Sequence, residues 1–272
     1  MEKITESLTD NLKTAINAAV SGGIEIMEIY KKPNFSSELK QNNSPLTEAD
    51  LAANRIINEY LERTNIPIIS EENKNLDFSE RKNWDTCWIV DPLDGTKEFI
   101  KRNGEFTVNI ALCHFGKPIL GVIYVPVSRE LYYANVNEGA AFKSILNESH
   151  MFSKELYRDE DRIFSNKLDE EVVRVVGSRS HMNQDTQEFI SKLKNDVKNV
   201  EIVSKGSSLK FCLVAEGKAD VYPRFAPTME WDTAAGHAIC NATGLKVISQ
   251  ETNEELPYNK ENLLNPYFLV TK

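Results

Sequence analysis

The 272-residue sequence has no apolar run of the length needed to span a bilayer, and its first residues lack the apolar core of a secretory signal. We therefore expect no integral membrane segment. Cysteine is scarce and no two cysteines form a Cys-x-x-Cys pair; the four are Cys87, Cys113, Cys212 and Cys240. Cysteines scattered through apolar segments favour buried free thiols in a reducing cytoplasm over a disulfide framework.

Positive charge is in the minority, because 32 Lys and Arg residues face 41 Asp and Glu residues and the net charge is −9. Binding to nucleic acid depends on Lys and Arg side chains that neutralise phosphates, so this composition argues against a nucleic-acid partner. It does not exclude an anionic small substrate, since a bound cation supplies local positive charge in such sites. We expect a cytoplasmic protein and leave peripheral attachment at the inner face of the membrane open. Monomer and homodimer also both stay open.

The apolar pattern predicts two halves. In the first, two helical stretches, of which one covers Asn17 to Tyr30, precede an antiparallel sheet whose strands are separated by hairpin signals. In the second, strands and helices alternate, which implies a layered α/β arrangement. Residues 151–168 are charged and poorly periodic, so we place the boundary there. The expected domains are an α+β domain over residues 1–155 and an α/β domain over residues 156–272.

Two carboxylates and a hydroxyl occupy the six residues from Asp91 to Thr96, directly after the apolar run Cys87 to Val90. Pro92 cannot donate to a sheet ladder, so we expect a buried strand to end there and the acids to follow it. Ligands of open α/β sheets bind at the carboxyl ends of strands. Asp91 and Asp94 are suited to share Mg²⁺ on an irregular loop. By itself, however, Asp-x-x-Asp-Gly is more often a turn.

Other acids follow or open predicted elements. Glu71 and Glu72 come after an apolar stretch, and Asp232 precedes a helix-compatible run in which an ordinary N-cap is the simpler interpretation. Thr47 and Asp50 have the spacing of a capping box, with Asp in place of the usual Glu or Gln. If these acids converge, two charges 4 Å apart repel by about 4 kcal/mol at an effective dielectric constant near 20. Bound cations would relieve that repulsion.

Three segments carry a family resemblance: Ser70-Glu71-Glu72, Trp88 to Thr96, and Trp231 to Gly236. Together they resemble the signature of the lithium-sensitive, magnesium-dependent phosphatase superfamily that includes inositol monophosphatase and the 3′(2′),5′-bisphosphate nucleotidases. The segments Lys97 to Thr107 and Gly206 to Cys212 are similar to the bacterial nucleotidases. The resemblance covers the chain from about Thr47 onward. It implies a layered αβαβα sandwich of the sugar phosphatase and inositol monophosphatase type.

The resemblance also implies a cofactor and a mechanism. Two or three Mg²⁺ ions would be held by the following ligands, with Asp91 as the bridge: Glu71, Asp91, the Leu93 carbonyl, Asp94 and Asp232. The implied catalytic residues are Asp50, Glu71 and Thr96, of which Asp50 and Thr96 would position and deprotonate a water. That water would attack a phosphomonoester directly. For Glu72 a structural role is the simpler interpretation.

Two glycine-containing loops, at residues 177–181 and 206–210, follow predicted strands and would present hydroxyls, amides and a cation to a second phosphate. Plain turns would have the same pattern. The resemblance favours these contacts to a nucleotide bisphosphate: Gly95, Thr96, Ser178, His181, Ser207 and Lys210. It implies hydrolysis of the 3′-phosphate of adenosine 3′,5′-bisphosphate to AMP and phosphate, which clears a by-product of sulfate activation. Lys40 would guard the metal entrance, although a solvated lysine is the simpler interpretation.

Two alternatives stay open. The metal-binding segments are shared across the superfamily, so an inositol or other sugar phosphatase has the same signature. A non-catalytic, magnesium-dependent nucleotide sensor would keep the fold without turnover. Neither the choice between 3′ and 2′ phosphates nor the acceptance of a sulfated nucleotide follows from the sequence.

Overall fold

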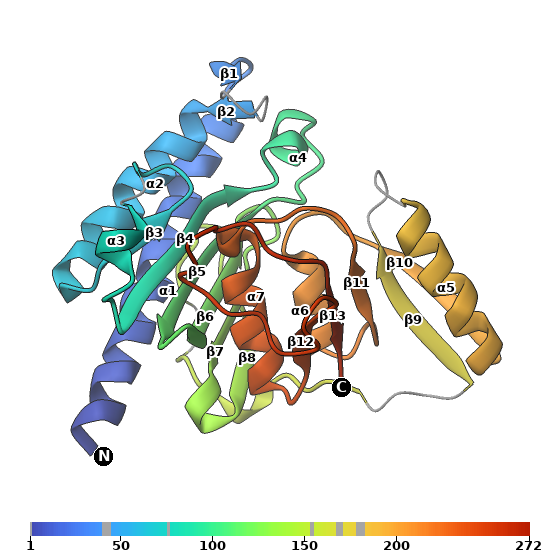
Figure 1. The fold of residues 1–272 in the computed structure, drawn as a ribbon. Helices are drawn as coiled ribbons and strands as arrows, with labels where there is room; N and C mark the ends of the chain where they lie inside the picture. The colour runs from blue at the N-terminus through green and yellow to red at the C-terminus, as the bar shows by residue number, and fades with distance from the viewer. Residues whose placement is uncertain (1, 40–44, 75–76, 153–154, 167–170, 178–182) are drawn as a thin grey trace.

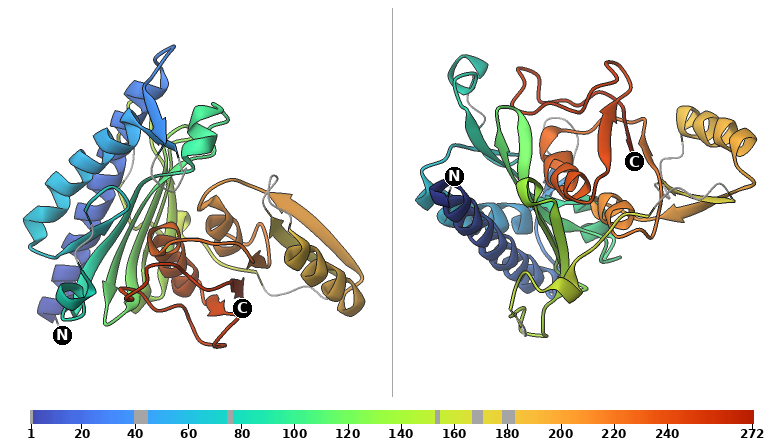
Figure 2. Two further views of the ribbon diagram at one scale, coloured as in Figure 1. Left: turned by 45° about the horizontal axis from the view of Figure 1, so that its top comes forward. Right: turned by 90° about the horizontal axis from the view of Figure 1, so that it is seen from below.

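The computed structural model describes residues 2–39, 45–74, 77–152, 155–166, 171–177 and 183–272. Its layers alternate between helices and sheets (Figures 1 and 2). Helices α1 and α2 cover one face of a six-stranded sheet, and α6 and α7 separate its other face from the strands of the second half of the chain, where α5 lies on the outside. The expected α/β class with an αβαβα layer order is confirmed. None of the helices in the described segments is both long and apolar enough to cross a membrane.

The first half supplies the large sheet, whose strand order is β3-β4-β5-β6-β7-β8. Only its β3–β4 pair is parallel. The elements are α1 (Glu2–Tyr30), β1 (Ser37–Leu39), β2 (Pro45–Thr47), α2 (Glu48–Leu61), η1 (Glu62–Thr64), β3 (Ile68–Ser70), α3 (Phe78–Arg81), β4 (Thr86–Asp94), α4 (Thr96–Ile100), β5 (Thr107–His114), β6 (Lys117–Val125), β7 (Glu130–Asn135), η2 (Val136–Glu138) and β8 (Ala140–Ile145).

The second half contributes two small sheets, a parallel β9–β10 pair and an antiparallel sheet of order β11-β13-β12. Its elements are η3 (Asp159–Asp161), β9 (Val172–Gly177), α5 (Gln184–Asp196), β10 (Asn199–Ser204), α6 (Leu209–Ala215), β11 (Tyr222–Arg224), α7 (Glu230–Ala242), β12 (Lys246–Ser249) and β13 (Phe268–Thr271). Helix α7 packs against the large sheet as well as against β12, so one hydrophobic core joins both halves. The division into domains at residues 155 and 156 stays a prediction.

Strand β4 shows why the large sheet needs helices on both faces. Trp88 and Val90 are buried in the core under α1 and α2, whereas Cys87 and Ile89 are buried in the core under α7. Successive side chains of a strand point to opposite faces, so a strand covered on both sides is apolar at every position. This explains the continuous apolar run that precedes Asp91.

Two predicted boundaries are wrong. Strand β4 does not end at Pro92 but continues to Asp94. It pairs with β3 only up to Val90, and its register with β5 shifts between Asp91 and Asp94. A proline is tolerated where the strand has a free edge and a bulge. Helix α1 begins at Glu2, well before Asn17, because Leu12 and other buried side chains extend its apolar face upstream.

Candidate active site

The carboxyl end of β4 meets the first turn of α7. Asp91, Asp94 and Asp232 each offer a carboxylate oxygen, and these three atoms lie within 4.8 Å of one another. Asp232 occupies the third position of α7, where it accepts a hydrogen bond of 2.7 Å from the backbone N–H of Met229. The N-cap interpretation of Asp232 is therefore wrong, because Met229 holds that position. The sheet and the helix thus bring together acids that are far apart in the sequence.

Burial and mutual repulsion make this cluster costly when it is charged. Burial, followed by the negative charges of Glu71 and Asp94, raises the pKa of Asp91 well above its usual value. Burial and then the charge of Asp94 likewise raise the pKa of Asp232. A converging set of carboxylate oxygens is the ligand chemistry that hard divalent cations such as Mg²⁺ prefer. The residues present therefore fit the expected cofactor.

Glu71 and Glu72 lie in the turn that follows β3. The backbone N–H of Glu71 donates to the carbonyl of Val90 over 3.2 Å, which fixes the turn beside Asp91. The negative charge of Glu71 contributes to the raised pKa of both Asp91 and Asp50. Glu71 therefore lies close enough to interact with both carboxyl groups. The backbone N–H of Glu72 lies 3.4 Å from the hydroxyl oxygen of Ser70. The metal-binding role of Glu71 stays a prediction, and the role of Glu72 stays open.

Asp50 connects the start of α2 to the turn after β4. One of its carboxylate oxygens accepts hydrogen bonds from the backbone N–H and the hydroxyl of Thr47, over 2.7 and 2.6 Å. The predicted capping box is confirmed. The other oxygen accepts a hydrogen bond of 3.1 Å from the hydroxyl of Thr96, which also lies 3.4 Å from the carbonyl oxygen of Leu93. Burial raises the pKa of Asp50, and the bonds from Thr47 oppose that rise.

The loop before α6 closes over Asp94. One oxygen of Asp94 accepts hydrogen bonds from the hydroxyl of Ser207 (2.5 Å) and from the backbone N–H and hydroxyl of Ser208 (2.7 and 2.6 Å). Ser208 was not among the predicted site residues. Ser207 has a positive φ of 51°, a conformation that is uncommon for residues other than glycine. The loop therefore orients a carboxylate of the cluster, in addition to any contact with substrate.

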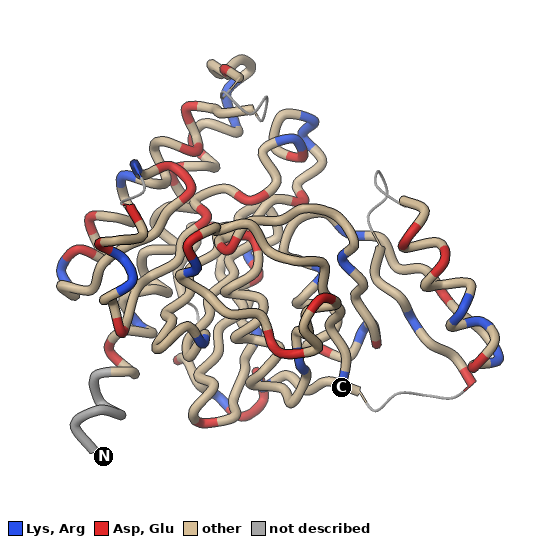
Figure 3. The backbone as a smooth tube through the Cα atoms, in the orientation of Figure 1, with Lys and Arg blue, Asp and Glu red and all other residues tan. Residues whose placement is uncertain are grey.

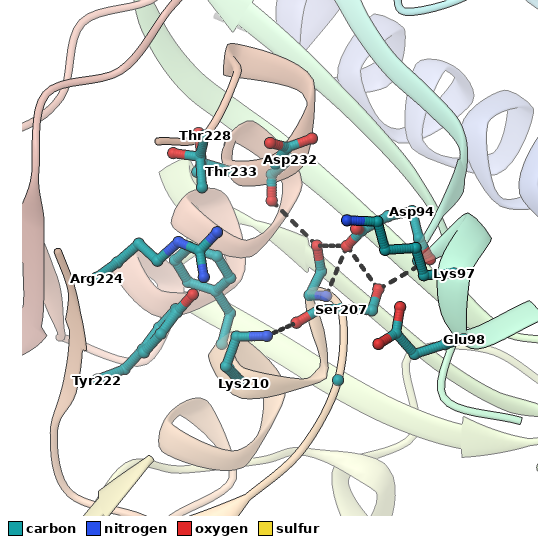
Figure 4. A pocket seen from close by; sticks show the side chains of 14 residues that line it. Asp94, Lys97, Glu98, Ser207, Lys210, Tyr222, Arg224, Thr228, Asp232 and Thr233 are labelled. Atoms are coloured by element: carbon teal, nitrogen blue, oxygen red, sulfur yellow. Dashed lines mark hydrogen bonds between the residues drawn. The ribbon is translucent and has the colours of Figure 1, made fainter. Parts of the chain in front are cut away.

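A pocket opens beside the cluster, and Asp94, Lys210, Arg224 and Asp232 surround it (Figure 4). The ammonium group of Lys210 donates to the carbonyl of Ser207 over 2.5 Å. Burial lowers the pKa of Lys210 to about 8; the charge of Asp94 opposes this shift and that of Arg224 adds to it. Lys97 lines the same pocket beside Asp94, so three cationic side chains share the pocket with the acids, a pattern suited to an anionic ligand (Figure 4).

The structure places some of the predicted substrate-binding residues together, and others lie outside the residues that it describes. The structure brings Gly95, Ser207 and Lys210 to the wall of one pocket, and Thr96 follows Gly95 at the start of α4. Ser178, His181 and Lys40 lie outside the described residues. Arg224 was missed, because a single arginine at the end of a short strand has no distinguishing sequence pattern.

The sequence matches the inositol monophosphatase family over residues 7–267. It is 45% identical over 265 residues to the 3′(2′),5′-bisphosphate nucleotidase CysQ of Salmonella typhimurium, covering 96% of this chain and 99% of that protein. It is 36% identical to the nucleotidase CysQ of Haemophilus influenzae, covering 95% of this chain and 91% of that protein.

Solved structures agree with this assignment. The crystal structure of CysQ from Bacteroides thetaiotaomicron, described as a bacterial member of the inositol monophosphatase family, superimposes with a TM-score of 0.84. The two sequences are 50% identical, and the match covers 96% of this chain and 97% of that one. The suhB protein of Bartonella henselae shares the fold, with a TM-score of 0.75 at 23% identity over 97% of this chain and 94% of that one. The predicted resemblance is confirmed, and the chain belongs to the inositol monophosphatase family.

Proposed function

We propose that this protein is a Mg²⁺-dependent phosphomonoesterase that hydrolyses the 3′-phosphate of adenosine 3′,5′-bisphosphate to AMP and phosphate. One observation carries the chemistry: the carboxylates of Asp91, Asp94 and Asp232 converge beside a pocket whose other wall holds Lys210 and Arg224. The choice of substrate is supported by the relatives of 45% and 36% identity that are named bisphosphate nucleotidases.

The cation site would be formed by Asp91, Asp94 and Asp232, with Glu71 and the Leu93 carbonyl as further ligands. Bound Mg²⁺ supplies Lewis acidity, which lowers the pKa of a coordinated water and stabilises charge on the attacking and leaving oxygens. Two or three ions are proposed. The helix dipole of α7 adds partial positive charge at its N-terminus, where Asp232 lies.

Asp50 and Thr96 would handle the proton of the attacking water. Because the hydroxyl of Thr96 donates its hydrogen to Asp50, the Thr96 oxygen is oriented to accept a hydrogen bond from a water. A carboxylate whose pKa is raised above its usual value is a better proton acceptor than an ordinary aspartate. Glu71 is the third proposed catalytic residue.

Recognition of the nucleotide is assigned to the other wall of the pocket. Lys210 and Arg224 bring two positive charges to it, and these would bind the phosphate that is not cleaved. Ser207 and Gly95 also line the pocket, and Ser178 and His181 remain proposed contacts to the nucleotide. A role in clearing a by-product of sulfate activation, in the cytoplasm, belongs to the same proposal. The four buried free cysteines suit a reducing compartment.

Phosphate release from adenosine 3′,5′-bisphosphate and from inositol 1-phosphate, measured side by side with Mg²⁺ and with a chelator, tests the proposal. We expect preference for the bisphosphate and no release with the chelator. Preference for inositol 1-phosphate would keep the metal chemistry and overturn the substrate. No release from either would favour the sensor.

Two variants refine this test. Asp94→Asn should abolish hydrolysis while the protein still folds, and turnover at the wild-type rate would contradict the metal mechanism. Lys210→Ala should raise KM for the bisphosphate far more than KM for inositol 1-phosphate. Equal effects on the two substrates would contradict the assignment of Lys210 to the nucleotide.

A further inference from the structure

A chain of amide hydrogen bonds connects α2 to the turn that carries Glu71 and Glu72. The backbone N–H of Asn73 donates to the carbonyl of Ser70 over 3.3 Å, so the two glutamates are the central residues of a four-residue turn. Asn54 of α2 bonds to Ser70 and Asn73, the residues that flank the two glutamates. Its carbonyl oxygen accepts a hydrogen bond from the Ser70 hydroxyl, and its amide donates to the Asn73 side chain, each over 2.8 Å. One side chain thus holds both ends of the turn.

Asn58 strengthens the same connection one helical turn later. Its amide donates to the Asn73 carbonyl oxygen over 3.0 Å, and its own carbonyl oxygen accepts from the Asn73 amide over 3.3 Å. Asp50, Asn54 and Asn58 follow one another at a spacing of four residues, so they lie along one face of α2. The helix that supplies Asp50 to the site therefore also supplies the anchors of the Glu71–Glu72 turn.

The turn needs these anchors because electrostatic repulsion acts against its position. The backbone N–H of Glu71 bonds to Val90, the residue before Asp91, so two residues with like-charged side chains belong to neighbouring segments, and like charges repel. The backbone bond from Glu71 to Val90 fixes one side of the turn against β4. Asn54 is only 8% exposed, and a buried amide that loses its partners carries a desolvation penalty. The side-chain bonds therefore oppose an outward movement of the turn.

We propose that Asn54 is a positioning residue that acts through Ser70 and Asn73. It fixes the Glu71–Glu72 turn relative to Asp50, and it thereby sets the affinity of the acidic cluster for divalent cations. This inference rests on the cation site of the proposed function. Outer partners that orient ligands typically change metal affinity or activity by about 10- to 100-fold when they are removed.

The test compares Asn54→Ala with the wild-type protein by isothermal titration with Mn²⁺ in the absence of substrate. We expect the dissociation constant for Mn²⁺ to rise on the order of tenfold. The Mg²⁺ concentration for half-maximal phosphate release should rise in parallel, while KM for the nucleotide at saturating Mg²⁺ stays near the wild-type value. An unchanged Mn²⁺ dissociation constant would overturn the inference.

Ile57→Val provides the matched control. Ile57 lies in the same helix and is fully buried, but it belongs to the apolar core and not to the amide chain. The control should lower the melting temperature without changing Mn²⁺ affinity. If it weakens Mn²⁺ binding as much as Asn54→Ala does, the role of Asn54 is merely structural and the inference fails.

Asn73→Ala provides a second test of the inference. Asn73 is only partly buried, so this substitution should disturb folding less than Asn54→Ala does. It should weaken Mn²⁺ binding too, and the double variant Asn54→Ala/Asn73→Ala should lose less than the sum of the two single losses, because both single variants remove the Asn54–Asn73 bond. Additive losses would overturn the inference.

A wild-type protein that binds Mn²⁺ more tightly than Asn54→Ala but hydrolyses no bisphosphate would support the positioning role and overturn only the proposed function. A wild-type protein that binds no cation would overturn both.

Discussion

At the scale of single residues, loss of the Thr96 hydroxyl should have a large effect on turnover. Thr96→Val keeps the shape of the side chain but removes the hydroxyl that donates to Asp50. We expect kcat to fall by about 10²- to 10⁴-fold, the usual contribution of a positioned proton-transfer group. Steady-state phosphate release measures this. Thr96→Ser retains the hydroxyl and should keep most of the activity, so an equal loss in both variants would contradict the role of the hydroxyl.

Lys210 should make substrate affinity depend on pH. Burial lowers its pKa to about 8, so the ammonium group loses its charge as the pH rises through that value. Between pH 7 and pH 9 the charged fraction falls roughly tenfold, and KM for the bisphosphate should rise by a similar factor. Lys210→Arg keeps its charge over this range and should show a flat profile. A flat wild-type profile would contradict either the lowered pKa of Lys210 or its contact with the phosphate.

The sequence predicted the acids better than their hydrogen-bond partners. Asp91 and Asp94 are recognisable because they follow an apolar run and belong to a signature. The bonds from Ser207 and Ser208 to Asp94 join segments that are far apart in the chain, and spacing carries no information about such contacts. Arg224 was missed for the same reason.

At the scale of elements, the contact between β6 and α7 should control the position of Asp232. Gly121 of β6 lies so close to α7 that an added Cβ would overlap the carbonyl oxygen of Ala235 and come within 2.7 Å of the Cβ of Ala238. Gly121→Ala should destabilise the protein by about 1–3 kcal/mol and also lower kcat, because α7 must shift and carries Asp232. Urea unfolding and steady-state kinetics measure the two effects.

Gly22→Ala is a control in which the added Cβ causes a milder overlap than in Gly121→Ala. A Cβ at Gly22 would come within 3.0 Å of the Cδ1 and Cγ1 atoms of Ile57, so it would crowd a side chain and not backbone, and Ile57 lies about two helical turns from Asp50 in α2. This variant should lose less stability and keep its kcat. If Gly121→Ala loses stability but no activity, α7 does not transmit the displacement to Asp232.

The elements themselves were predicted where the apolar pattern is strong. Strand β9 and the C-terminal end of α1 fall where the sequence indicates. Strand β4 runs past Pro92 because no backbone N–H is needed at that position: the strand has a free edge and a bulge there. Both are properties of the sheet and not of the local sequence. Asp232 occupies the third position of its helix because Met229, a residue with no typical capping pattern, precedes the first turn.

At the scale of the whole molecule, the layered arrangement brings acids from β4 and α7 to one place at the cost of repulsion. Cations that bind the folded protein and not the unfolded chain should raise its stability, by about 2.7 kcal/mol at a concentration 100 times the dissociation constant. Mg²⁺ should therefore raise the melting temperature and a chelator should lower it. Thermal unfolding monitored by circular dichroism measures the difference.

The difference in melting temperature between the protein with Mg²⁺ and the protein with a chelator should grow with pH. In the folded, cation-free protein the pKa of Asp232 is raised to about 8 and that of Asp91 well above its usual value, so the folded state binds more protons than the unfolded chain once the pH exceeds the usual range of an aspartate. Stability without cations must then fall as the pH rises through the raised pKa, whereas it is fully present below the unfolded value. Bound cations remove this penalty, because they neutralise the ionised carboxylates. The gap in melting temperature between Mg²⁺ and chelator should thus be wider at pH 8 than at pH 6, and Asp91→Asn should narrow it at both. A gap that is independent of pH would show that Asp91 is already ionised in the cation-free protein, and the cluster would then need another source of compensating charge.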